Sequence, residues 1–349
     1  MDKISIFDAP GIERLQRELR IDPQRLRKLR TALFKHFESD ELSVADFPFA
    51  ERILLHPLTL DSRHDSQLDG ATKLLFRTAT GMLIESVILR IATGRTTLCV
   101  SSQVGCAAAC DFCATGKMGI AQNLSPAEIC DQVLQAGQLL ASEDRSIRNI
   151  VFMGMGEPFH NEENLYTALE LLTAPKTFHF SPTKILVSTV GIADAMLRCV
   201  RRFPQVNLAL SLHSVRQEAR EKLIPLAKRF PLDQLQATLR QINSLQGKQV
   251  MIEYLMLAGV NDSLSEAEEL VAWLAGVNVH VNLIPYNAID DAPHLVATQR
   301  REREAFAAIL KSAGIPTTIR YSLGADIAAA CGQLVRKENR EVARSLHAQ

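Results

Sequence analysis

The pattern of apolar and polar residues becomes regular near residue 97. From there to about residue 322, short apolar runs typical of buried strands alternate with stretches of helical periodicity. The expected strands are 97–102, 149–155, 184–190, 207–213, 249–257, 280–287 and 316–322. The expected helices are one that begins after Ser125 and others near 164–174, 192–203, 231–245, 265–275 and 298–313. This alternation predicts parallel strands joined by right-handed helical crossovers, and therefore an α/β fold with a partial or complete barrel.

Two different patterns precede this region. Residues 11–37 carry apolar residues at helical spacing and predict two helices, the second beginning at Asp22. Apolar and β-branched runs at 72–78 and 82–89 predict a β-hairpin. Glu85 interrupts the second of these runs, and a lone glutamate in a strand usually faces solvent. The expected domains are a helical module at 1–70, a hairpin extension at 71–96, a barrel core at 97–335 and a C-terminal tail at 336–349.

Composition indicates a soluble cytoplasmic protein. Hydrophobic residues make up 47% of the chain and charged residues 22%, which is typical of a globular protein. No apolar run approaches the ~20 residues that a bilayer span needs, and the first residues lack the pattern of a signal peptide. We therefore expect a cytoplasmic protein with no membrane contact. In the reducing cytosol, its seven cysteines favour metal binding or catalysis over structural disulfides.

The net charge is zero, but the N-terminal region is locally basic. Between residues 14 and 35 the only acids are Glu18 and Asp22. The bases there are Arg14, Arg17, Arg20, Arg25, Arg27, Lys28, Arg30 and Lys35. Such a patch can contact a phosphate backbone, and it can equally be the solvated face of a helix. Charge alone leaves both interpretations open.

Four of the seven cysteines lie within 15 residues. Cys106, Cys110 and Cys113 form a C-x3-C-x2-C loop, whereas Cys99 lies in the preceding apolar run. Three thiolates on one short loop favour an iron–sulfur cluster whose fourth iron stays open. A structural zinc site, which prefers four protein ligands, and ordinary buried thiols are the alternatives. Cys130 and Cys199 have helical surroundings and are expected to be small packing residues.

Polar residues gather where the predicted strands end. These are the 154–158 segment, Ser188, the 211–213 segment, Glu253 and Asn287. In α/β barrels the C-terminal ends of the strands build the active site. Their joint position therefore predicts one shared site.

Five segments together resemble the RlmN/Cfr family of radical S-adenosylmethionine (SAM) enzymes. They are LCVSSQVGC at 98–106, FCATG at 112–116, MGMGEP at 153–158, SLH at 211–213 and DIAAACGQL at 326–334. The family methylates an adenine ring carbon of 23S rRNA. The RlmN branch acts on carbon 2, also in some tRNAs, and the Cfr branch acts on carbon 8. The resemblance covers about residues 70–335, whereas the N-terminal helices match only in character.

The resemblance implies a two-stage reaction that uses two SAM molecules per turnover and one [4Fe-4S] cluster on Cys106, Cys110 and Cys113. One SAM methylates Cys331. A second SAM is cleaved to a 5′-deoxyadenosyl radical, which removes hydrogen from the methyl group on Cys331. The resulting carbon radical adds to the adenine, and Cys99 then releases the methylated RNA by forming a transient disulfide with Cys331. This implies that Cys331 lies on a loop after the last strand, although its local sequence alone is more typical of a buried helix.

The remaining roles follow residue by residue from the resemblance. Gly156 and Glu157 are similar to the pair that receives the SAM amino group. Glu85 aligns with a glutamate that acts as a proton acceptor in the family, and the Cys99 thiolate is the other candidate for this role. The positions that match SAM contacts in the family are Ser188, Ser211, Leu212, His213 and Asn287.

The branch of the family is indicated by few residues. Pro158 is typical of the RlmN branch, whereas Gln122 stands where that branch usually carries arginine. Carbon 2 of an RNA adenine is therefore favoured, with carbon 8 or another RNA as the alternative. The resemblance further implies an N-terminal module that contacts RNA, a reductant such as flavodoxin, and a monomer. A radical SAM enzyme with a non-RNA substrate, or a zinc protein that binds RNA without catalysis, are the competing classes.

Overall fold

A mixed β-sheet forms the centre of the molecule. The computed structural model describes residues 3–91, 93–119, 121–334 and 339. Within these residues, ten strands form one sheet in the order β14-β13-β12-β11-β10-β9-β6-β5-β4-β3. Neighbouring strands from β6 to β14 are parallel, which confirms the predicted partial α/β barrel. These strands are β6 (Thr96–Cys99), β9 (Asn149–Phe152), β10 (Ile185–Thr189), β11 (Asn207–Ser211), β12 (Val250–Met256), β13 (Val279–Pro285) and β14 (Thr317–Ile319).

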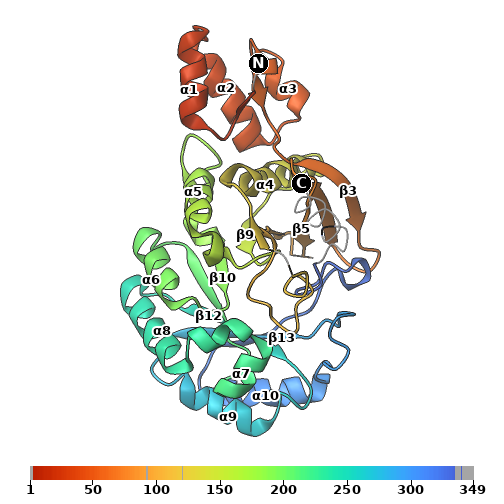
Figure 1. The fold of residues 1–349 in the computed structure, drawn as a ribbon, viewed down its shortest axis with the longest axis vertical. Coiled ribbons are helices and arrows are strands. Elements are labelled where there is room, and N and C mark those ends of the chain that lie inside the picture. The colour runs from red at the N-terminus through yellow and green to blue at the C-terminus, as the bar shows by residue number, and fades with distance from the viewer. Residues whose placement is uncertain (1–2, 92, 120, 335–338, 340–349) are drawn as a thin grey trace.

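Helices connect the parallel strands, and Figure 1 shows several of them gathered around the lower part of the sheet. The helices are α4 (Pro126–Ala141), α5 (Glu162–Thr173), α6 (Ala193–Arg202), α7 (Gln217–Leu223), α8 (Leu232–Gln246), α9 (Leu264–Trp273) and α10 (Arg300–Ser312). A capping box between Ser125 and Glu128 starts α4 as predicted. Cys130 and Cys199 are buried in the core, in agreement with their expected packing role. The short helix α7 is an addition to the sequence prediction.

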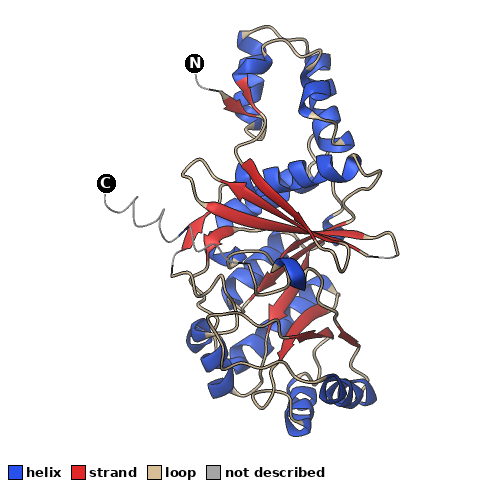
Figure 2. Cartoon of the chain, turned by 90° about the vertical axis from the view of Figure 1, so that its right-hand side faces the viewer, coloured by secondary structure: helices blue, strands red, loops and turns tan. Residues whose placement is uncertain are grey.

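Three antiparallel strands extend the sheet beyond β6. β4 (Ala71–Arg77) and β5 (Leu83–Arg90) confirm the predicted hairpin, and β5 pairs with β6. The third, β3 (Thr59–Asp65), pairs with β4, although the sequence analysis placed these residues in the helical module. Nearly all side chains of β3 are exposed, so the strand has no apolar alternation to reveal it. Figure 2 shows how the strands twist through the middle of the molecule.

Glu85 corrects the expectation of a solvated strand residue, because its side chain is only 1% exposed. Both faces of β5 are covered. On one face, Ser86 donates a hydrogen bond to Gln132 of α4 at 2.6 Å. On the other, Glu85 lies 3.9 Å from the Lys73 ammonium, which also donates to the Ala328 carbonyl at 3.3 Å. The C-terminal segment thus covers a face that local sequence predicts to be open.

The N-terminal module forms the upper end of the molecule in Figure 1. It contains β1 (Ile4–Ser5), α1 (Ala9–Glu18), α2 (Pro23–Thr31), the π-helical turn η1 (Ala32–His36), α3 (Asp40–Val44) and β2 (Ile53–Leu54). The two predicted helices are confirmed, with side-chain caps from Asp8 and Asp22. Phe34 packs against Phe178 with a ring-centroid distance of 4.8 Å, which joins the module to the barrel.

The segment after β14 folds back over the sheet. It contains the 3₁₀ turn η6 (Ala325–Ile327), and Asp326 accepts hydrogen bonds from the side chain of Ser66 and the backbone of Gln67. Except for Asn339, the predicted C-terminal tail at 336–349 lies outside the described residues. In the described part of the chain, no helix is both long enough and apolar enough to cross a membrane.

Candidate active site

A cavity of about 820 Å³ opens at the C-terminal ends of the parallel strands. Each parallel strand from β6 to β14 contributes side chains to its wall. Its volume is in the range of small-molecule sites. The predicted site residues that line it are Cys99, Cys106, Cys110, Cys113, Gly156, Glu157, Ser188, Ser211, His213 and Cys331. Folding therefore brings together most of the residues that sequence analysis had singled out.

The cysteine loop closes on itself through a small antiparallel pair. β7 (Gln103–Gly105) pairs with β8 (Ala121–Asn123), and the three loop cysteines lie between them. Burial raises the pKa of the Cys106 thiol to about 12 and also raises that of Cys110 well above its usual value, and nearby thiols reinforce both shifts. The loop thus presents three soft donors that influence one another electrostatically, and such a donor set fits an iron–sulfur cluster.

The three thiols line one cavity. Across the described residues, no group of three or more His, Cys, Asp or Glu side chains is arranged so that it could hold a metal ion. Each cysteine of an iron–sulfur cluster binds a different iron, so a cluster on this loop does not need the close ligand group that a single ion requires.

Gly156 and Glu157 hold a tight turn beside the loop. Gly156 has φ +104°, and a Cβ there would lie 2.6 Å from Cβ of Gln103. The Glu157 backbone N–H donates to the Gln103 side chain at 2.9 Å, and its carboxylate accepts from the backbone N–H groups of Phe159 and Val190. Burial raises the pKa of Glu157 to about 7 despite these hydrogen bonds. A neighbouring ammonium group would stabilise the ionised form of this buried carboxylate.

His213 presents a neutral ring to the cavity. Its Nδ1 accepts a hydrogen bond from the Leu255 backbone N–H at 3.0 Å, so the ring proton must lie on Nε2. Burial, followed by the charge of Arg220, lowers the pKa of His213 to about 3. The ring also contacts Phe112 edge-on at a centroid distance of 4.8 Å. His213 can therefore donate a hydrogen bond but carries no charge near neutral pH.

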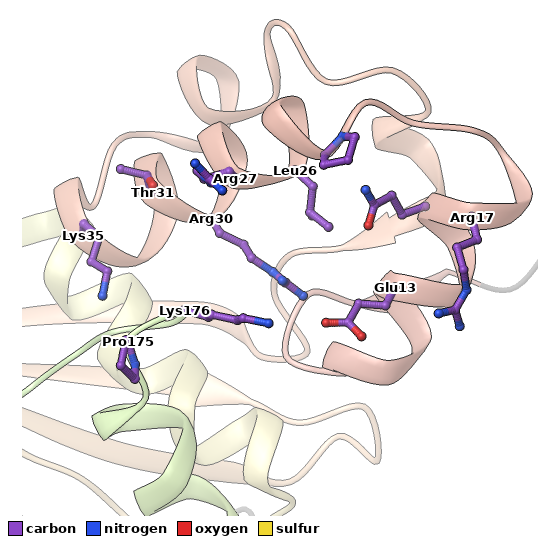
Figure 3. A pocket seen from close by; sticks show the side chains of 11 residues that line it. Glu13, Arg17, Leu26, Arg27, Arg30, Thr31, Lys35, Pro175 and Lys176 are labelled. Carbon is purple, nitrogen blue, oxygen red and sulfur yellow. The ribbon is translucent and has the colours of Figure 1, made fainter.

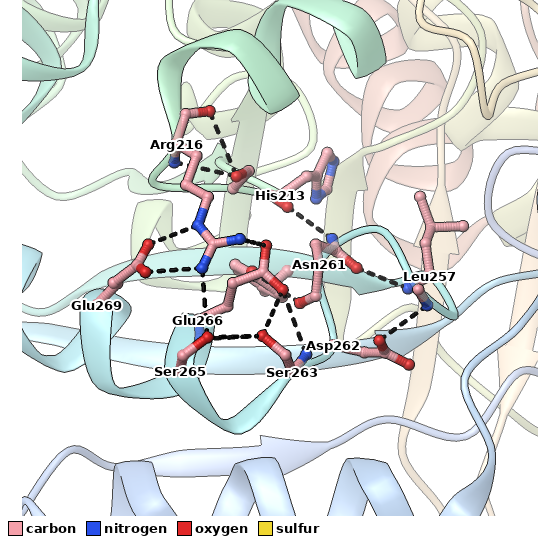
Figure 4. A network of polar contacts seen from close by, with 12 residues as sticks. His213, Arg216, Leu257, Asn261, Asp262, Ser263, Ser265, Glu266 and Glu269 are labelled. Atoms are coloured by element: carbon pink, nitrogen blue, oxygen red, sulfur yellow. Dashed lines mark hydrogen bonds and ion pairs between the residues drawn. The ribbon is translucent and has the colours of Figure 1, made fainter.

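A network of polar contacts holds the backbone of His213, as Figure 4 shows. Asn261 donates from Nδ2 to the carbonyls of His213 and Leu255, both at 2.6 Å. The Asn261 side chain is fully buried and also accepts from the Leu257 N–H at 2.8 Å. These contacts maintain His213 at its positive φ of 59°. Sequence analysis missed Asn261 because it follows its strand within an ordinary turn-like stretch.

Cys99 and Cys331 reach the same cavity although they are 232 positions apart. Burial and the nearby Cys331 raise the pKa of the Cys99 thiol to about 12. Cys331 is exposed and follows the 3₁₀ turn η6 in an irregular segment, which confirms the expected loop. The two loops touch, because the Ala114 N–H donates to the Gly332 carbonyl at 2.8 Å.

Arg320, just beyond β14, was missed by the sequence analysis. It lines the cavity, and its guanidinium offsets part of the rise in pKa that desolvation causes at the Cys99 and Cys331 thiols. The available signal was its place at the end of the last predicted strand. Sequence alone does not show that this side chain turns toward the two thiols.

Three predicted site residues do not line the cavity. Leu212 is fully buried. Asn287 donates from Nδ2 to the Cys331 carbonyl at 3.2 Å, so it holds the Cys331 loop. Glu85 lies under the C-terminal segment, on the same sheet face as Val87, which does line the cavity.

Comparisons with known proteins show the family of this chain. The Radical SAM superfamily matches residues 100–274. A Rhodopirellula baltica protein named "Probable RNA methyltransferase" is 61% identical over 338 residues, which cover 97% of this chain and 89% of that protein. A Thermus thermophilus protein named "Probable dual-specificity RNA methyltransferase RlmN" is 39% identical over 334 residues, with coverage of 94% and 93%.

A solved structure extends the match to the fold. A radical SAM methyltransferase from Sphaerobacter thermophilus superposes with a TM-score of 0.90 at 38% identity, covering 95% of this chain and 99% of that one. The superfamily implies a [4Fe-4S] cluster and SAM as cofactors. This chain therefore belongs to the RlmN-type family of radical SAM RNA methyltransferases.

Proposed function

We propose that this enzyme methylates carbon 2 of an adenine in RNA, with 23S rRNA as the first candidate substrate and tRNA as the second. The observation that carries the proposal is the meeting of Cys99 and Cys331 beside the cysteine loop in one cavity. A radical SAM enzyme without a methyl-carrying cysteine has no need of this pair. Pro158 favours carbon 2 over carbon 8.

In this proposal one part of the cavity wall holds the cluster and another part holds SAM. Cys106, Cys110 and Cys113 hold the [4Fe-4S] cluster, which when bound supplies the electron for reductive cleavage of SAM. Gly156 and Glu157 receive the SAM amino group, since a buried carboxylate pairs with an ammonium. Hydrogen bonds to the rest of SAM come from the Ser188 and Ser211 hydroxyls and from Nε2–H of His213.

The two thiols act in sequence. Cys331 is exposed in the cavity and accepts the methyl group from the first SAM. After the methyl group on Cys331 has lost a hydrogen atom and its carbon has joined the adenine, the adduct loses the ring proton and one electron, which the oxidised cluster would accept. The Cys99 thiolate then bonds to the Cys331 sulfur. The bond between that sulfur and the transferred carbon breaks, its electron pair stays with the carbon, and a proton completes the methyl group. The Arg320 guanidinium supports this step, because it favours the thiolate form of Cys99.

The proton that leaves the adenine ring has two candidate acceptors. Cys99 already lines the cavity, whereas Glu85 reaches it only if the segment that carries Cys331 moves aside. A Glu85→Gln variant separates the two roles. If Glu85 is the acceptor, this variant retains methylated Cys331 but forms no methylated RNA. Normal RNA methylation would assign the proton to Cys99.

The N-terminal module supplies the proposed RNA contact. A pocket of about 530 Å³ opens between α1, α2, η1 and the segment after α5. Figure 3 shows Arg30, Lys176 and the single carboxylate, Glu13, directed into this pocket. Among the described residues, the buried Nε of Arg30 and Nζ of Lys35 have no hydrogen-bond partner. Phosphate groups of an RNA backbone at this pocket would supply a counter-charge to these basic side chains.

The cellular setting follows from the same family. We expect a cytoplasmic monomer that receives electrons from a reductant such as flavodoxin. A methylation assay with reduced flavodoxin as the sole electron source tests the donor. Analytical sedimentation of the purified protein tests the monomer.

Mass mapping of methyladenosines in rRNA and tRNA tests the function as a whole. Cells that lack the gene should lose 2-methyladenosine, and the wild-type gene should restore it, but a Cys331→Ala variant should not. Loss of 8-methyladenosine instead would assign the enzyme to carbon 8. Unchanged RNA in the deletion strain would contradict the proposal.

A further inference from the structure

Helix α7 packs directly against the cysteine loop. The carbonyl of Leu223, in the last turn of α7, accepts a hydrogen bond from the Asp111 backbone N–H at 2.9 Å. Leu223 and Ile224 share a buried apolar cluster with Cys110. The face of α7 that carries Leu223 is therefore next to the middle cysteine of the loop. Arg220 lies on this helix one turn earlier.

The Arg220 side chain is fully buried, which is rare for an arginine. Its Nε donates to the Leu212 carbonyl at 3.2 Å, and its Nη2 donates to the Val190 carbonyl at 2.5 Å. These bonds tie the ends of β10 and β11 together, where Ser188 and Ser211 line the cavity. The guanidinium therefore positions the backbone at the proposed SAM site.

One end of the guanidinium is left over. Among the described residues, Nη1 of Arg220 has no hydrogen-bond partner, and no carboxylate forms an ion pair with this side chain. A buried cation that lacks a counter-charge, and whose Nη1 group lacks a hydrogen-bond partner, is strongly unfavourable. His213, its neighbour in the cavity wall, is neutral and cannot balance the charge. The anionic group must come from elsewhere.

The cysteine loop can supply it. Arg220 lies one turn before Leu223 on α7, on the side of the helix that packs against Cys110. A [4Fe-4S] cluster on three thiolates is an anion, and one further electron makes it more negative. A buried cation next to it favours the reduced form, and hydrogen bonds to cluster sulfurs act in the same direction.

We propose that Nη1 of Arg220 donates a hydrogen bond to sulfur at the Cys110 corner of the bound cluster, and that this arginine raises the reduction potential of the cluster. Arg220 is then a positioning residue with two functions. Its Nε and Nη2 fix the strand ends at the SAM site, and its Nη1 eases reduction of the cluster. The inference rests on the proposed ligands Cys106, Cys110 and Cys113.

Redox titration of the reconstituted protein without SAM tests the electrostatic part. We compare wild type with Arg220→Met and Arg220→Lys, after measuring iron and sulfide per chain in each. The matched control is Arg216→Met, because Arg216 lies on the same stretch but pairs with Glu269 at the surface. We expect a more negative potential in Arg220→Met, an intermediate value in Arg220→Lys and the wild-type value in the control.

The outcomes test the proposed cluster ligands and the proposed role of Arg220 separately. A wild-type protein that binds no cluster would contradict the ligand set itself. A fully loaded Arg220→Met protein with the wild-type potential would overturn only the role of Arg220. The same holds if this variant weakens SAM binding without changing the potential, since Nη1 would then serve SAM.

A measurement on the unaltered enzyme covers the case in which Arg220→Met fails to fold. Wild-type protein labelled with ¹⁵N-arginine is reduced without SAM and studied by pulsed electron paramagnetic resonance. The cluster spin should couple weakly to an arginine nitrogen, and the coupling should disappear in Arg220→Lys. Absence of the coupling in a fully loaded, reduced cluster would overturn the hydrogen bond.

Discussion

Asn287 donates a hydrogen bond from its Nδ2 to the backbone carbonyl of Cys331, at 3.2 Å. A residue that family resemblance assigns to SAM thus holds the loop of the proposed methyl carrier. The loop has a second attachment, because the Gly332 carbonyl accepts from the Ala114 N–H in the cysteine loop. These two hydrogen bonds attach the backbone at Cys331 and Gly332 to two separate parts of the barrel.

The first prediction concerns this hydrogen bond. Asn287→Ala should slow methylation of Cys331 roughly five-fold, the effect of losing one hydrogen bond of about 1 kcal/mol. The affinity for SAM should stay near wild type, because Asn287 does not line the cavity. Single-turnover mass spectrometry of the Cys331 peptide and equilibrium SAM binding measure the two effects. A large loss of SAM affinity with normal methylation kinetics would show that Asn287 contacts SAM.

The second prediction concerns the release of product. Cys99→Ala should accumulate an RNA molecule covalently attached to Cys331, because no thiol remains to break the bond between sulfur and carbon. Denaturing gels and mass spectrometry of the nuclease-treated protein detect this adduct. Cys199→Ala is the matched control, since Cys199 is buried in the core away from the cavity and should turn over normally. Free methylated RNA at normal yield from Cys99→Ala would exclude Cys99 as the releasing thiol.

The third prediction concerns the basic pocket of the N-terminal module. Combined Arg30→Met and Lys35→Met should weaken RNA binding and reduce the slope of log affinity against log salt by up to about 2, because each lost phosphate contact removes about one counterion. The matched control combines Arg14→Met and Lys28→Met, which lie in the same module outside the pocket. Equal losses in both pairs would indicate a diffuse charge effect in place of a specific pocket.

The fourth prediction concerns the junction between the module and α4. His56 contacts Asp131 at 2.6 Å and Asp40 at 2.9 Å. Burial alone would lower the pKa of His56, but these hydrogen bonds outweigh it and raise the pKa to about 9. Folding therefore favours the protonated ring, and its contribution to stability is complete below about pH 6.5 and disappears as pH rises through 9.

This contribution is on the order of 3 kcal/mol, because the pKa of His56 rises from 6.5 to about 9. Urea unfolding of the wild type at several pH values between 6.5 and 9 should show the free energy of unfolding falling. His56→Gln should be less stable at pH 6.5 and should show a flatter dependence on pH. An equal slope in the variant would mean that other groups cause the loss.

Sequence alone determined the framework and the chemistry of the site. Apolar periodicity located the seven parallel strands, because a buried parallel strand reads as a continuous apolar run. The spacing of Cys106, Cys110 and Cys113 is local, so one loop must bring them to one place. The pair of Cys99 and Cys331 was found only through resemblance, since no local rule connects residues so far apart.

Tertiary structure decided the features that depend on what covers a surface. Glu85 reads as a solvated strand residue, but the returning C-terminal segment buries it. The exposed side chains of β3 hide a strand that exists because β4 offers backbone partners. Arg220 and Arg320 look like ordinary helical and strand-end cations, and only folding places one behind the cysteine loop and the other beside Cys99. Burial and charge pairing depend on contacts between distant segments, so local periodicity does not predict them.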